Sequence, residues 1–579
     1  MATSDKYDRQ LRLWGAQGQR ALGETCVVLI GTSAAGTETL KNLVLPGIGS
    51  ICIVDSNAAS NGDYASNFFQ TQRPSTATTS VMIPRAQHVL ELLQELNPDV
   101  QGQFETVEDW LDFDYSALLQ GLQAKSKHVL IVGSDLEPPI VLRLLSALEQ
   151  PSLVNIPLLL VQSYGLLGTV RVHCTSAVPI LDPKFRDTVP DLRLVQPFDT
   201  LSQLADSIQW ESLENHQHAH IPYPLILLKI AKEWKASHNQ QLPSTFAEKQ
   251  DFQKAIKAMA RNCDMELNFQ EAHTNAYLAY SQRELDTTHF EEILPKVKLH
   301  AQRLAQTKGT SVSTDDKPDC RVLYSLLLAL DRFLNKKSSS SSSSVRPPPL
   351  HGTIPDMTSS TDLYVQLQTM YKEQAERDVQ ELRSLLPTDA YCDPTCISDA
   401  VLQTFCQNVY HVDVFLTRSI SDEYDLTTPI PSTIVEDLVM STMEDDERPE
   451  QLPMLWYLGL AACRLFYKDH GRYPGTLFSS GDKKTYEQDV SKLQACLVKI
   501  VHHYELQDVE LIQSTLLASE CQYAQELVRY GNAEVHNIAS IVGGVGSQEA
   551  VKLITGQYVP INHTYVYNGI ASIGGVYQF

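Results

Sequence analysis

The chain has 579 residues, and 46 lysine and arginine residues stand against 69 aspartate and glutamate residues, so its formal net charge is −23 at pH 7. This length predicts about two to four structural units, because a single core rarely grows beyond about 250 to 300 residues. The acidic balance disfavours a protein held mainly by nucleic-acid phosphates or by a polybasic membrane anchor, because both need a surplus of basic residues.

No apolar run approaches the roughly 18 to 20 residues that a membrane-spanning helix needs. The N-terminus also lacks the apolar core of a secretory signal. The eleven cysteines are scattered along the chain and odd in number. This usage predicts reduced thiols rather than a disulfide framework. We therefore expect an intracellular protein of the cytoplasm and nucleus.

The first 170 or so residues alternate between strand and helix patterns. Residues 26–30 form a continuous apolar, β-branched run, which is typical of a parallel strand buried on both faces. A small-residue turn and a helix over 37–45 follow. The same rhythm predicts strands at 51–54, 129–132 and 157–161 and helices at 86–96 and 140–148. Such alternation favours a doubly wound, Rossmann-like α/β domain.

From about residue 191 to 482 the pattern becomes mainly helical, with clear helical periodicity in 225–234, 246–259, 322–334, 363–386 and 452–466. The serine and proline tract at 336–349 is predicted to be disordered, because such residues bury too little apolar area to offset their ordering entropy.

The last 60 or so residues return to α/β character, with a helix expected over 538–555 and a strand over 564–567. A sheet domain that resumes at the C-terminus implies that the helical part is inserted into it. We therefore expect an α/β domain in two parts, 1–180 and 483–579, split by a large, mainly helical insertion at 181–482.

The turn after the first strand is a candidate phosphate site. A dinucleotide or ATP fingerprint needs Gly-x-Gly-x-x-Gly, so that backbone amides at a helix N-terminus can approach phosphates. Here the outer residues Gly31 and Gly36 are present, but Ser33 replaces the middle glycine. Asp55 stands about 20 positions after Gly36, where a ribose ligand is expected. The pattern favours a turn kept for packing over a working nucleotide site.

One further block makes the sequence recognisable. Residues 7–15 read Tyr-Asp-Arg-Gln-Leu-Arg-Leu-Trp-Gly, and together with 43–49 and Asp55 they resemble the adenylation domain of ubiquitin-like-modifier-activating enzymes. More blocks resemble the regulatory, non-catalytic subunits of the neddylation branch of that family. They are Asn67-Phe68-Phe69, the segments 352–357 and 471–475, and Gly543-Gly544 with 548–552. The resemblance runs from Lys6 to Phe579 and implies a ThiF/MoeB-like fold.

The family's catalytically complete subunits have an intact glycine loop, an Asn-x-x-Arg-Gln segment and a lysine at the start of the next helix. This chain departs at all three places: the loop carries Ser33 and Ala34, residues 67–70 lack the arginine, and Arg85 stands where the lysine is expected. An arginine does not simply replace a compact ammonium in a phosphate cradle. The resemblance therefore implies a pseudo-adenylation domain that holds no cofactor, with Mg-ATP bound in the partner subunit.

In this family the arginine of the Tyr-x-Arg-Gln block reaches across the dimer to the partner's ATP. Here that residue is Arg9. The resemblance implies that Arg9 acts as an arginine finger, a fixed cation beside the developing phosphate charge. A structural salt bridge is the alternative.

The sequence offers little evidence for a thioester cysteine or a metal site. Cys396, in Pro394-Thr395-Cys396, only superficially resembles the family's reactive cysteine, because Ile397 follows it where a threonine is expected. We expect a structural thiol in a loop. The spacing of Cys392, Cys396 and Cys406 fits no common zinc module.

His216, His218 and His220 alternate along one short run, and a strand there would point all three imidazoles the same way and could bind zinc. The resemblance instead makes His220 a contact with the catalytic subunit. It also makes the segment 356–368 a docking segment, with interface residues Asp356, Met357, Leu363, Tyr364 and Leu367. Ordinary core packing is the alternative for Leu363 and Leu367.

The resemblance implies a regulatory subunit of a heterodimeric activating enzyme. With its catalytic partner it would adenylate the C-terminal glycine of the ubiquitin-like neddylation modifier, form a thioester on the partner's cysteine and deliver the modifier to a conjugating enzyme. No activity is expected from the chain alone. The alternatives are a sumoylation-type regulatory subunit, a Rossmann-type nucleotide-dependent oxidoreductase, and a scaffold without a trans-acting residue.

Overall fold

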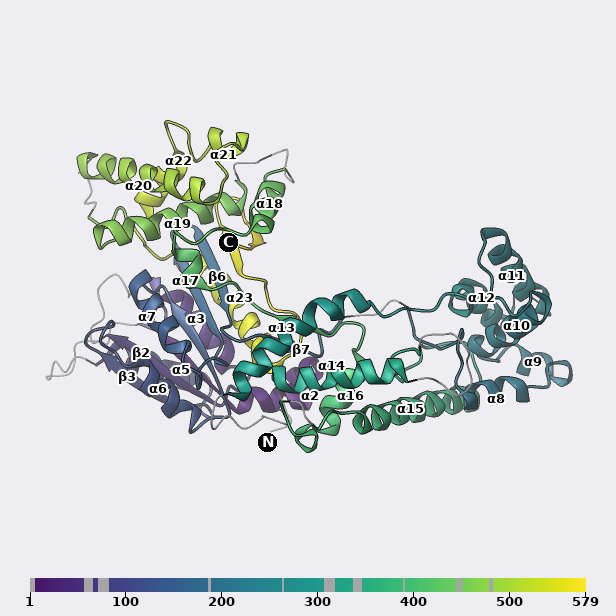
Figure 1. The fold of residues 1–579 in the computed structure, drawn as a ribbon. Helices are drawn as coiled ribbons and strands as arrows, with labels where there is room; N and C mark the ends of the chain where they lie inside the picture. Colours follow the sequence, from purple (N-terminus) through teal and green to yellow (C-terminus); the bar gives the residue numbers. More distant parts are fainter. Residues whose placement is uncertain are drawn as a thin grey trace. The chain divides into compact units, whose positions relative to one another are not determined.

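The computed structural model describes residues 6–56, 66–70, 83–185, 189–262, 265–306, 318–336, 346–388, 391–443, 448, 451–477 and 483–579. The chain forms two compact units (Figure 1). Unit 1 comprises Met1–Ile180, Arg303–Ser311 and Val414–Phe579, and unit 2 comprises Leu181–Gln302 and Val312–Asp413. The structure thus divides the region 181–482 between the two units.

Unit 1 is built on an eight-stranded sheet in the order β10-β9-β6-β5-β4-β1-β2-β3. The strands are β1 Thr25–Ile30, β2 Ser50–Ser56, β3 Gln101–Val107, β4 His128–Ser134, β5 Leu158–Tyr164, β6 Leu167–His173, β9 Thr564–Asn568 and β10 Ile573–Tyr577. From β3 to β5 the neighbours are parallel, and β6, β9 and β10 continue the sheet antiparallel. The predicted α/β class is confirmed. A separate two-stranded sheet pairs β7 Val178–Ile180 with β8 Asp413–Phe415.

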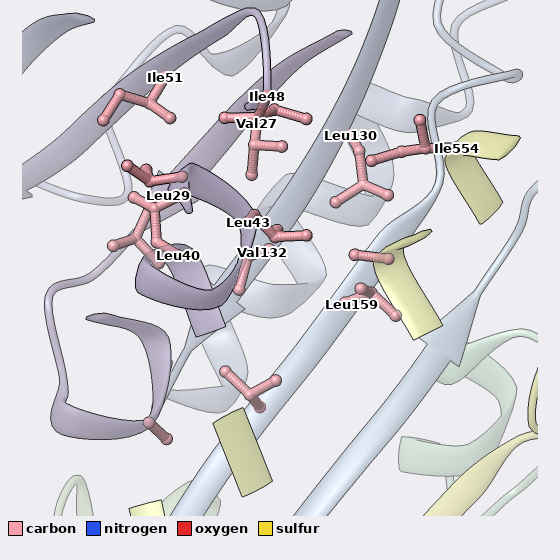
Figure 2. Close-up of a cluster of buried hydrophobic side chains, with 14 of the residues drawn as sticks. Val27, Leu29, Leu40, Leu43, Ile48, Ile51, Leu130, Val132, Leu159 and Ile554 are labelled. Carbon is pink, nitrogen blue, oxygen red and sulfur yellow. The ribbon is translucent and has the colours of Figure 1, made fainter. Parts of the chain in front are cut away.

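Alternate residues of the parallel strands supply two cores, one on each face of the sheet. Val27 and Leu29 of β1 lie in the core under the helices α2 Asp8–Gly23, α3 Ala34–Val44, α5 Arg85–Leu96 and α23 His536–Thr555 (Figure 2). Val28 and Ile30 lie in the opposite core, under α6 Tyr115–Gln123 and α7 Pro138–Leu148. Each fully buried side chain of this size contributes about 1.5 to 3 kcal/mol of hydrophobic free energy. Burial on both faces explains why these strands read as continuous apolar runs.

The C-terminal motif contains two adjacent glycines, Gly543 and Gly544, and only Gly543 is required by close packing. A Cβ at Gly543 of α23 would lie 2.7 Å from the Glu38 Cβ and 2.9 Å from the Thr39 backbone nitrogen of α3. A Cβ at Gly544 would meet no heavy atom within 4 Å. The close crossing of α3 and α23 therefore requires glycine at 543 and not at 544.

We expect Gly543→Ala to lower the free energy of unfolding by about 1 to 3 kcal/mol, because the methyl group forces two packed helices apart. Gly544→Ala is the matched control and should be neutral or stabilising by up to about 1 kcal/mol, because alanine is the better helix former. Urea unfolding followed by circular dichroism measures both. Equal effects at the two positions would contradict this account of the crossing.

A helical layer completes unit 1 at the antiparallel end of the sheet. It contains α17 Ile420–Tyr424, α18 Ser432–Ser441, α19 Pro453–His470, α20 Lys483–His503, α21 Glu510–Ser514 and α22 Gln522–Tyr530. The apolar side chains of α18 to α22 form one core with Tyr164 and Leu167 of the β5–β6 hairpin and with Val566 of β9, whereas Ile420 of α17 lies in the core under α6 and α7. This shared core is the physical reason why the described residues after 413 belong to unit 1.

A buried polar network lies between β6, β9 and the segment that leads into α17. Arg171 Nε donates to a Glu423 carboxylate oxygen at 2.9 Å, and both side chains are buried. The His563 ring nitrogen Nε2 accepts the Arg418 backbone N–H at 3.0 Å. Burial, reinforced by the nearby Arg171 cation, lowers the pKa of His173 to about 4 and that of His563 to about 3. Both imidazoles are therefore neutral in the folded protein at pH 7.

This network predicts acid sensitivity. A histidine in the unfolded chain takes up a proton below about pH 6.5, whereas His563 does so in the folded protein only near pH 3. Stability is therefore full above about pH 6.5 and falls as the pH drops towards 3.

We expect His563→Gln to make the free energy of unfolding less dependent on pH between about 6.5 and 4 than it is in the wild type. His502→Gln changes an exposed histidine and should leave the pH dependence unchanged. Urea unfolding at a series of pH values provides the test. Parallel pH profiles for wild type and His563→Gln would contradict the prediction.

Unit 2 is mainly helical. Its elements are α8 Asp199–Ser207, η1 Trp210–Ser212, α9 Asn215–His218, α10 Tyr223–Ser237, α11 Phe246–Met259, α12 Leu267–Thr274, η2 Ala276–Ala279, α14 Cys320–Asn335, α15 Thr361–Ser384, η3 Pro394–Cys396 and α16 Asp399–Gln407, with most of α13 Thr287–Ala305. The core gathers around α10, and Leu367 and Tyr371 of α15 are fully buried in it.

The predicted serine and proline tract lies in unit 2, and its residues 337–345 fall outside the described part of the chain. Lys336 and Arg346, on either side of them, both form ion pairs with Glu381 of α15. No helix within the described ranges is long and apolar enough to cross a membrane.

Candidate functional site

The loop between β1 and α3 is where this fold binds phosphates, and its backbone has the expected form. Gly31 has φ +81°, and a Cβ there would lie 2.6 Å from the Ser134 carbonyl oxygen. Ser33 is the N-cap of α3, and its hydroxyl accepts the Gly36 N–H at 3.5 Å. The helix thus begins at Ala34, three residues before the predicted start, because the serine cap ends the turn early.

The first amides of α3 already bind an anion. The carboxylate of Glu534, in the segment between α22 and α23, accepts the Ala34 N–H at 2.8 Å and the Ala35 N–H at 3.3 Å. These N–H groups, at the positive end of the helix dipole, are the donors that a nucleotide phosphate needs. The Glu534 carboxylate therefore lies on the donors at which a nucleotide phosphate would bind in this fold.

The structure also shows where the Ser33 side chain points. Its hydroxyl contacts the Ser134 hydroxyl as well as capping α3, so it is directed into the protein. The sequence showed only that Ser33 replaces the middle glycine, whereas the group that lies on the amides belongs to Glu534. Sequence reasoning missed Glu534 because it is 500 positions away from Ala34 and carries no local signal.

Asp55, the residue expected to bind a ribose, contacts other residues of this chain instead. Asp55 lies near the C-terminal end of β2 and is 3% exposed. Its carboxylate accepts the Thr32 N–H at 3.0 Å and the Ser56 N–H at 2.7 Å, and it lies 3.4 Å from Arg85 Nε. Arg85, the residue at the place of the family's lysine, is the first residue of α5. The acidic and basic groups of the pocket thus neutralise each other.

The segment 66–70 closes the same pocket from another side. Asn67 donates to the Thr32 carbonyl oxygen at 2.9 Å and accepts the Thr37 hydroxyl at 3.1 Å. Gln70 also donates to the Thr32 carbonyl oxygen, at 3.2 Å. The Phe68 ring is exposed and lies 3.6 Å from the His536 ring, centroid to centroid. The residues of the family's Asn-x-x-Arg-Gln segment thus serve internal hydrogen bonds here.

A second buried carboxyl group adjoins Glu534. Asp135 directly follows β4, and its carboxyl accepts the Gln162 amide at 3.2 Å and the Asn532 amide at 3.3 Å. Burial and the negative charge of Glu534 raise the pKa of Asp135 to about 8. At pH 7 Asp135 is therefore largely protonated, so the pocket holds one negative charge at this point rather than two.

We expect Asp55→Ala to destabilise unit 1 by about 2 to 4 kcal/mol, because it removes the acceptor of the buried Thr32 N–H and the ion-pair partner of the half-buried Arg85. Asp99→Ala removes an exposed carboxylate that pairs with Lys6 and should leave stability unchanged. Chemical unfolding of both variants checks this. A mild effect of Asp55→Ala would contradict a structural role for that carboxylate.

Arg9 lies in the first turn of α2 and is exposed. Within the described ranges no residue hydrogen-bonds to its guanidinium or forms an ion pair with it. The start of α2 is held in place by Tyr7, whose hydroxyl accepts the Asn97 amide at 3.2 Å. The next basic residue, Arg12, is paired with Asp8 at 2.9 Å. A salt bridge to the described residues is thus not the role of Arg9.

The predicted docking residues lie together in unit 2. The His220 carbonyl oxygen accepts the N–H of Ser360, the N-cap of α15, at 2.9 Å. The Tyr364 hydroxyl donates to Asp356 at 3.4 Å. Met357 and Leu363 are partly buried against the core. Leu367 is fully buried in that core, so it supports this surface from below and is not itself available to a partner.

The alternative of three histidines alternating along a strand is not what the structure shows. Residues 215–218 form the short helix α9, and the His218 imidazole points away from those of His216 and His220. His218 is buried and lies 2.6 Å from a Glu266 carboxylate oxygen, whereas His216 and His220 stack on each other with centroids 4.3 Å apart. No group of three or more metal-ligating side chains occurs among the described residues.

Cys396 ends the three-residue 3₁₀ turn η3, where a loop was predicted, and it is half-buried. The neighbouring Asp393 accepts the Thr395 N–H at 2.8 Å, which shapes this turn. Cys392 and Cys406 are buried, and burial raises the pKa of both thiols, that of Cys406 to about 12. These two thiols are therefore poor nucleophiles at pH 7. A structural role for Cys396 stays a prediction.

The comparisons with known proteins agree with this geometry. A model of the ThiF family matches residues 7–132. The NEDD8-activating enzyme E1 regulatory subunit of Xenopus laevis is 34% identical over 99% of this chain and 98% of its own length. The chain belongs to the family of NEDD8-activating enzyme regulatory subunits.

Other members of this regulatory-subunit family match over similar lengths. The Arabidopsis thaliana protein named NEDD8-activating enzyme E1 regulatory subunit AXR1 is 31% identical over 98% of this chain and 94% of its own length. Among solved structures, E. coli tRNA N6-threonylcarbamoyladenosine dehydratase, TcdA, is 17% identical over 28% of this chain and 63% of its own, with a TM-score of 0.22. The full-length matches support the neddylation branch over the sumoylation and oxidoreductase alternatives.

Proposed function

We propose that this chain is the regulatory half of a heterodimeric NEDD8-activating enzyme and completes the active site of its catalytic subunit. That subunit would hold Mg-ATP, adenylate the C-terminal glycine of the modifier and carry it as a thioester on its own cysteine. The conjugating enzyme would then receive the modifier from the complex, in the cytoplasm and nucleus. The chain itself would bind no nucleotide and have no activity alone.

One observation carries this proposal: the phosphate-binding amides of α3 are occupied by Glu534, while Arg9 is exposed and unpaired among the described residues. Because the Glu534 carboxylate accepts the first N–H groups of α3, these donors are not vacant for ATP. A fixed, unpaired cation on a helix that is anchored to the sheet domain is suited to act on a phosphate outside this chain. An arginine placed in this way can raise the rate of a phosphate reaction by a factor of about 10³ to 10⁵.

We expect Arg9→Ala to lower ATP–pyrophosphate exchange by the reconstituted heterodimer at least tenfold, because the developing charge in the partner's site loses its cation. Arg9→Lys should recover only part of the rate, since a point charge lacks the guanidinium fork. Arg12→Ala, which removes the neighbouring paired arginine, is the control.

Size-exclusion chromatography must show that each variant still assembles with the catalytic subunit. An unchanged exchange rate for Arg9→Ala in an intact heterodimer would favour a scaffold role for this chain and contradict the proposal.

The surface around the start of α15 is proposed as a docking site for the catalytic subunit. It combines Asp356, Tyr364 and His220, which are at least partly exposed, with Met357 and Leu363, which rest on the core. Thr358 ties this surface to α12, because its N–H and hydroxyl donate to the Glu271 carboxylate. A rigid support of this kind lowers the entropic cost of binding.

We expect Tyr364→Ala to weaken assembly with the catalytic subunit at least tenfold, because an aromatic side chain with a polar tip is a typical interface anchor. Arg377→Ala, on an exposed part of the same helix, should leave assembly unchanged. Surface plasmon resonance with immobilised catalytic subunit measures both affinities. Equal affinities for the two variants would exclude this surface from the interface.

A further inference from the structure

We infer that Glu534 is the residue that excludes nucleotide from this chain, by serving as a permanent internal substitute for the phosphate at the start of α3. This inference rests on the proposed function, in which the chain binds no nucleotide. It assigns the loss of binding to a side chain outside the glycine loop rather than to the altered loop sequence.

The contact has the geometry of a bound anion. The two carboxylate oxygens of Glu534 accept two successive backbone N–H groups, those of Ala34 and Ala35, one oxygen to each. Hydrogen bonds to a charged acceptor are stronger than neutral ones. The positive end of the helix dipole adds to this attraction. A phosphate would have to displace an anion that is already held at the same donors.

The chain around Glu534 keeps the carboxylate at this place. We call residues 532–536 the closing segment. Asn532 donates to Asp135 at the end of β4, and the Ala533 carbonyl oxygen accepts the Gly165 N–H at 2.7 Å. On the other side of Glu534, His536 Nδ1 contacts the Ser66 carbonyl oxygen at 3.0 Å. The closing segment is therefore bound on both sides of Glu534, which lowers the entropy that the carboxylate loses on binding.

The charges around the start of α3 are consistent with Glu534 as the anion bound there. Asp135, whose carboxyl adjoins the closing segment, is largely protonated at pH 7, since burial and Glu534 raise its pKa to about 8. Arg85 forms an ion pair with Asp55 on the other side of the loop. An incoming phosphate would thus meet the charge of Glu534, and Arg85 is already paired with Asp55.

Ser33 is the competing explanation, because it interrupts the glycine fingerprint. Its hydroxyl, however, caps α3 and contacts Ser134. Replacing Ser33 with glycine would recreate Gly-x-Gly-x-x-Gly in the sequence and leave Glu534 on the amides. The two explanations therefore predict opposite results for the same single variant.

The experiment compares the full chain with Ser33→Gly, with Glu534→Ala and with the double variant. Isothermal titration calorimetry at pH 7 measures the binding of pyrophosphate and of ATP to each, after circular dichroism and thermal unfolding confirm folding. Glu526→Ala, which removes a carboxylate paired with Arg529 on α22, is the matched control.

We expect no binding by the wild type, Ser33→Gly or Glu526→Ala. Glu534→Ala should bind pyrophosphate at least tenfold more tightly than the wild type, and the double variant more tightly still. Binding by Ser33→Gly alone, or a folded Glu534→Ala that binds no better than wild type, would overturn the inference. If Glu534→Ala does not fold, Glu534→Gln removes only the charge and should still bind pyrophosphate more tightly than the wild type. Equal binding by Glu534→Gln and wild type would then overturn it.

The outcome separates this inference from the proposed function. Nucleotide binding by the wild-type chain would contradict both. If neither Glu534→Ala nor the wild type binds pyrophosphate or ATP, only the role of Glu534 is contradicted. The Arg9 measurements on the heterodimer would still test the proposed function.

Discussion

The contact between the Glu534 carboxylate and the first amides of α3 determines what unit 1 can do. A helix N-terminus in a sheet of this order is an anion site, because unpaired N–H groups and the helix dipole point the same way. Here an anion from the same chain satisfies these donors. The fold of a nucleotide-binding domain is thereby kept while its phosphate site is used for internal packing.

The rest of the pocket is consistent with this use. Asp55, Arg85 and Asn67 occupy the places at which a nucleotide-binding relative would present ligands, yet each contacts residues of its own chain. A buried polar group without a partner is costly, and hydrogen bonds within the chain reduce that cost here. The hydrogen bonds to Thr32 from Asn67 and from Gln70 have this effect.

Arg9 presents the opposite situation. It is exposed and, within the described part of the chain, has no partner, although the turn before it is anchored by Tyr7 and Asn97. An exposed, unpaired arginine on an anchored helix fits the role proposed for Arg9 at the partner's site. The surface at the start of α15 in unit 2 is likewise supported from within, by the buried Leu367 and by the contact of Glu271 with Thr358.

The sequence by itself determined the α/β class, the parallel strands β1, β2, β4 and β5, and the family, because continuous apolar runs and long ordered motifs are local signals. It did not reveal β3 or β10, whose polar and glycine-rich residues lie at the edges of the sheet and carry no buried run. It also left open a zinc-binding strand for three histidines, whereas the structure has a short helix there and buries His218 against Glu266.

Only the tertiary structure decided how the phosphate site is closed. Glu534 and Ala34 are 500 positions apart, and the closing segment is brought to the loop because α23 crosses closely on α3 at Gly543. Packing that depends on such distant residues leaves no periodic pattern in the sequence. Departures from a motif can therefore be read along the chain, whereas the group that replaces the ligand is known only once the chain has folded.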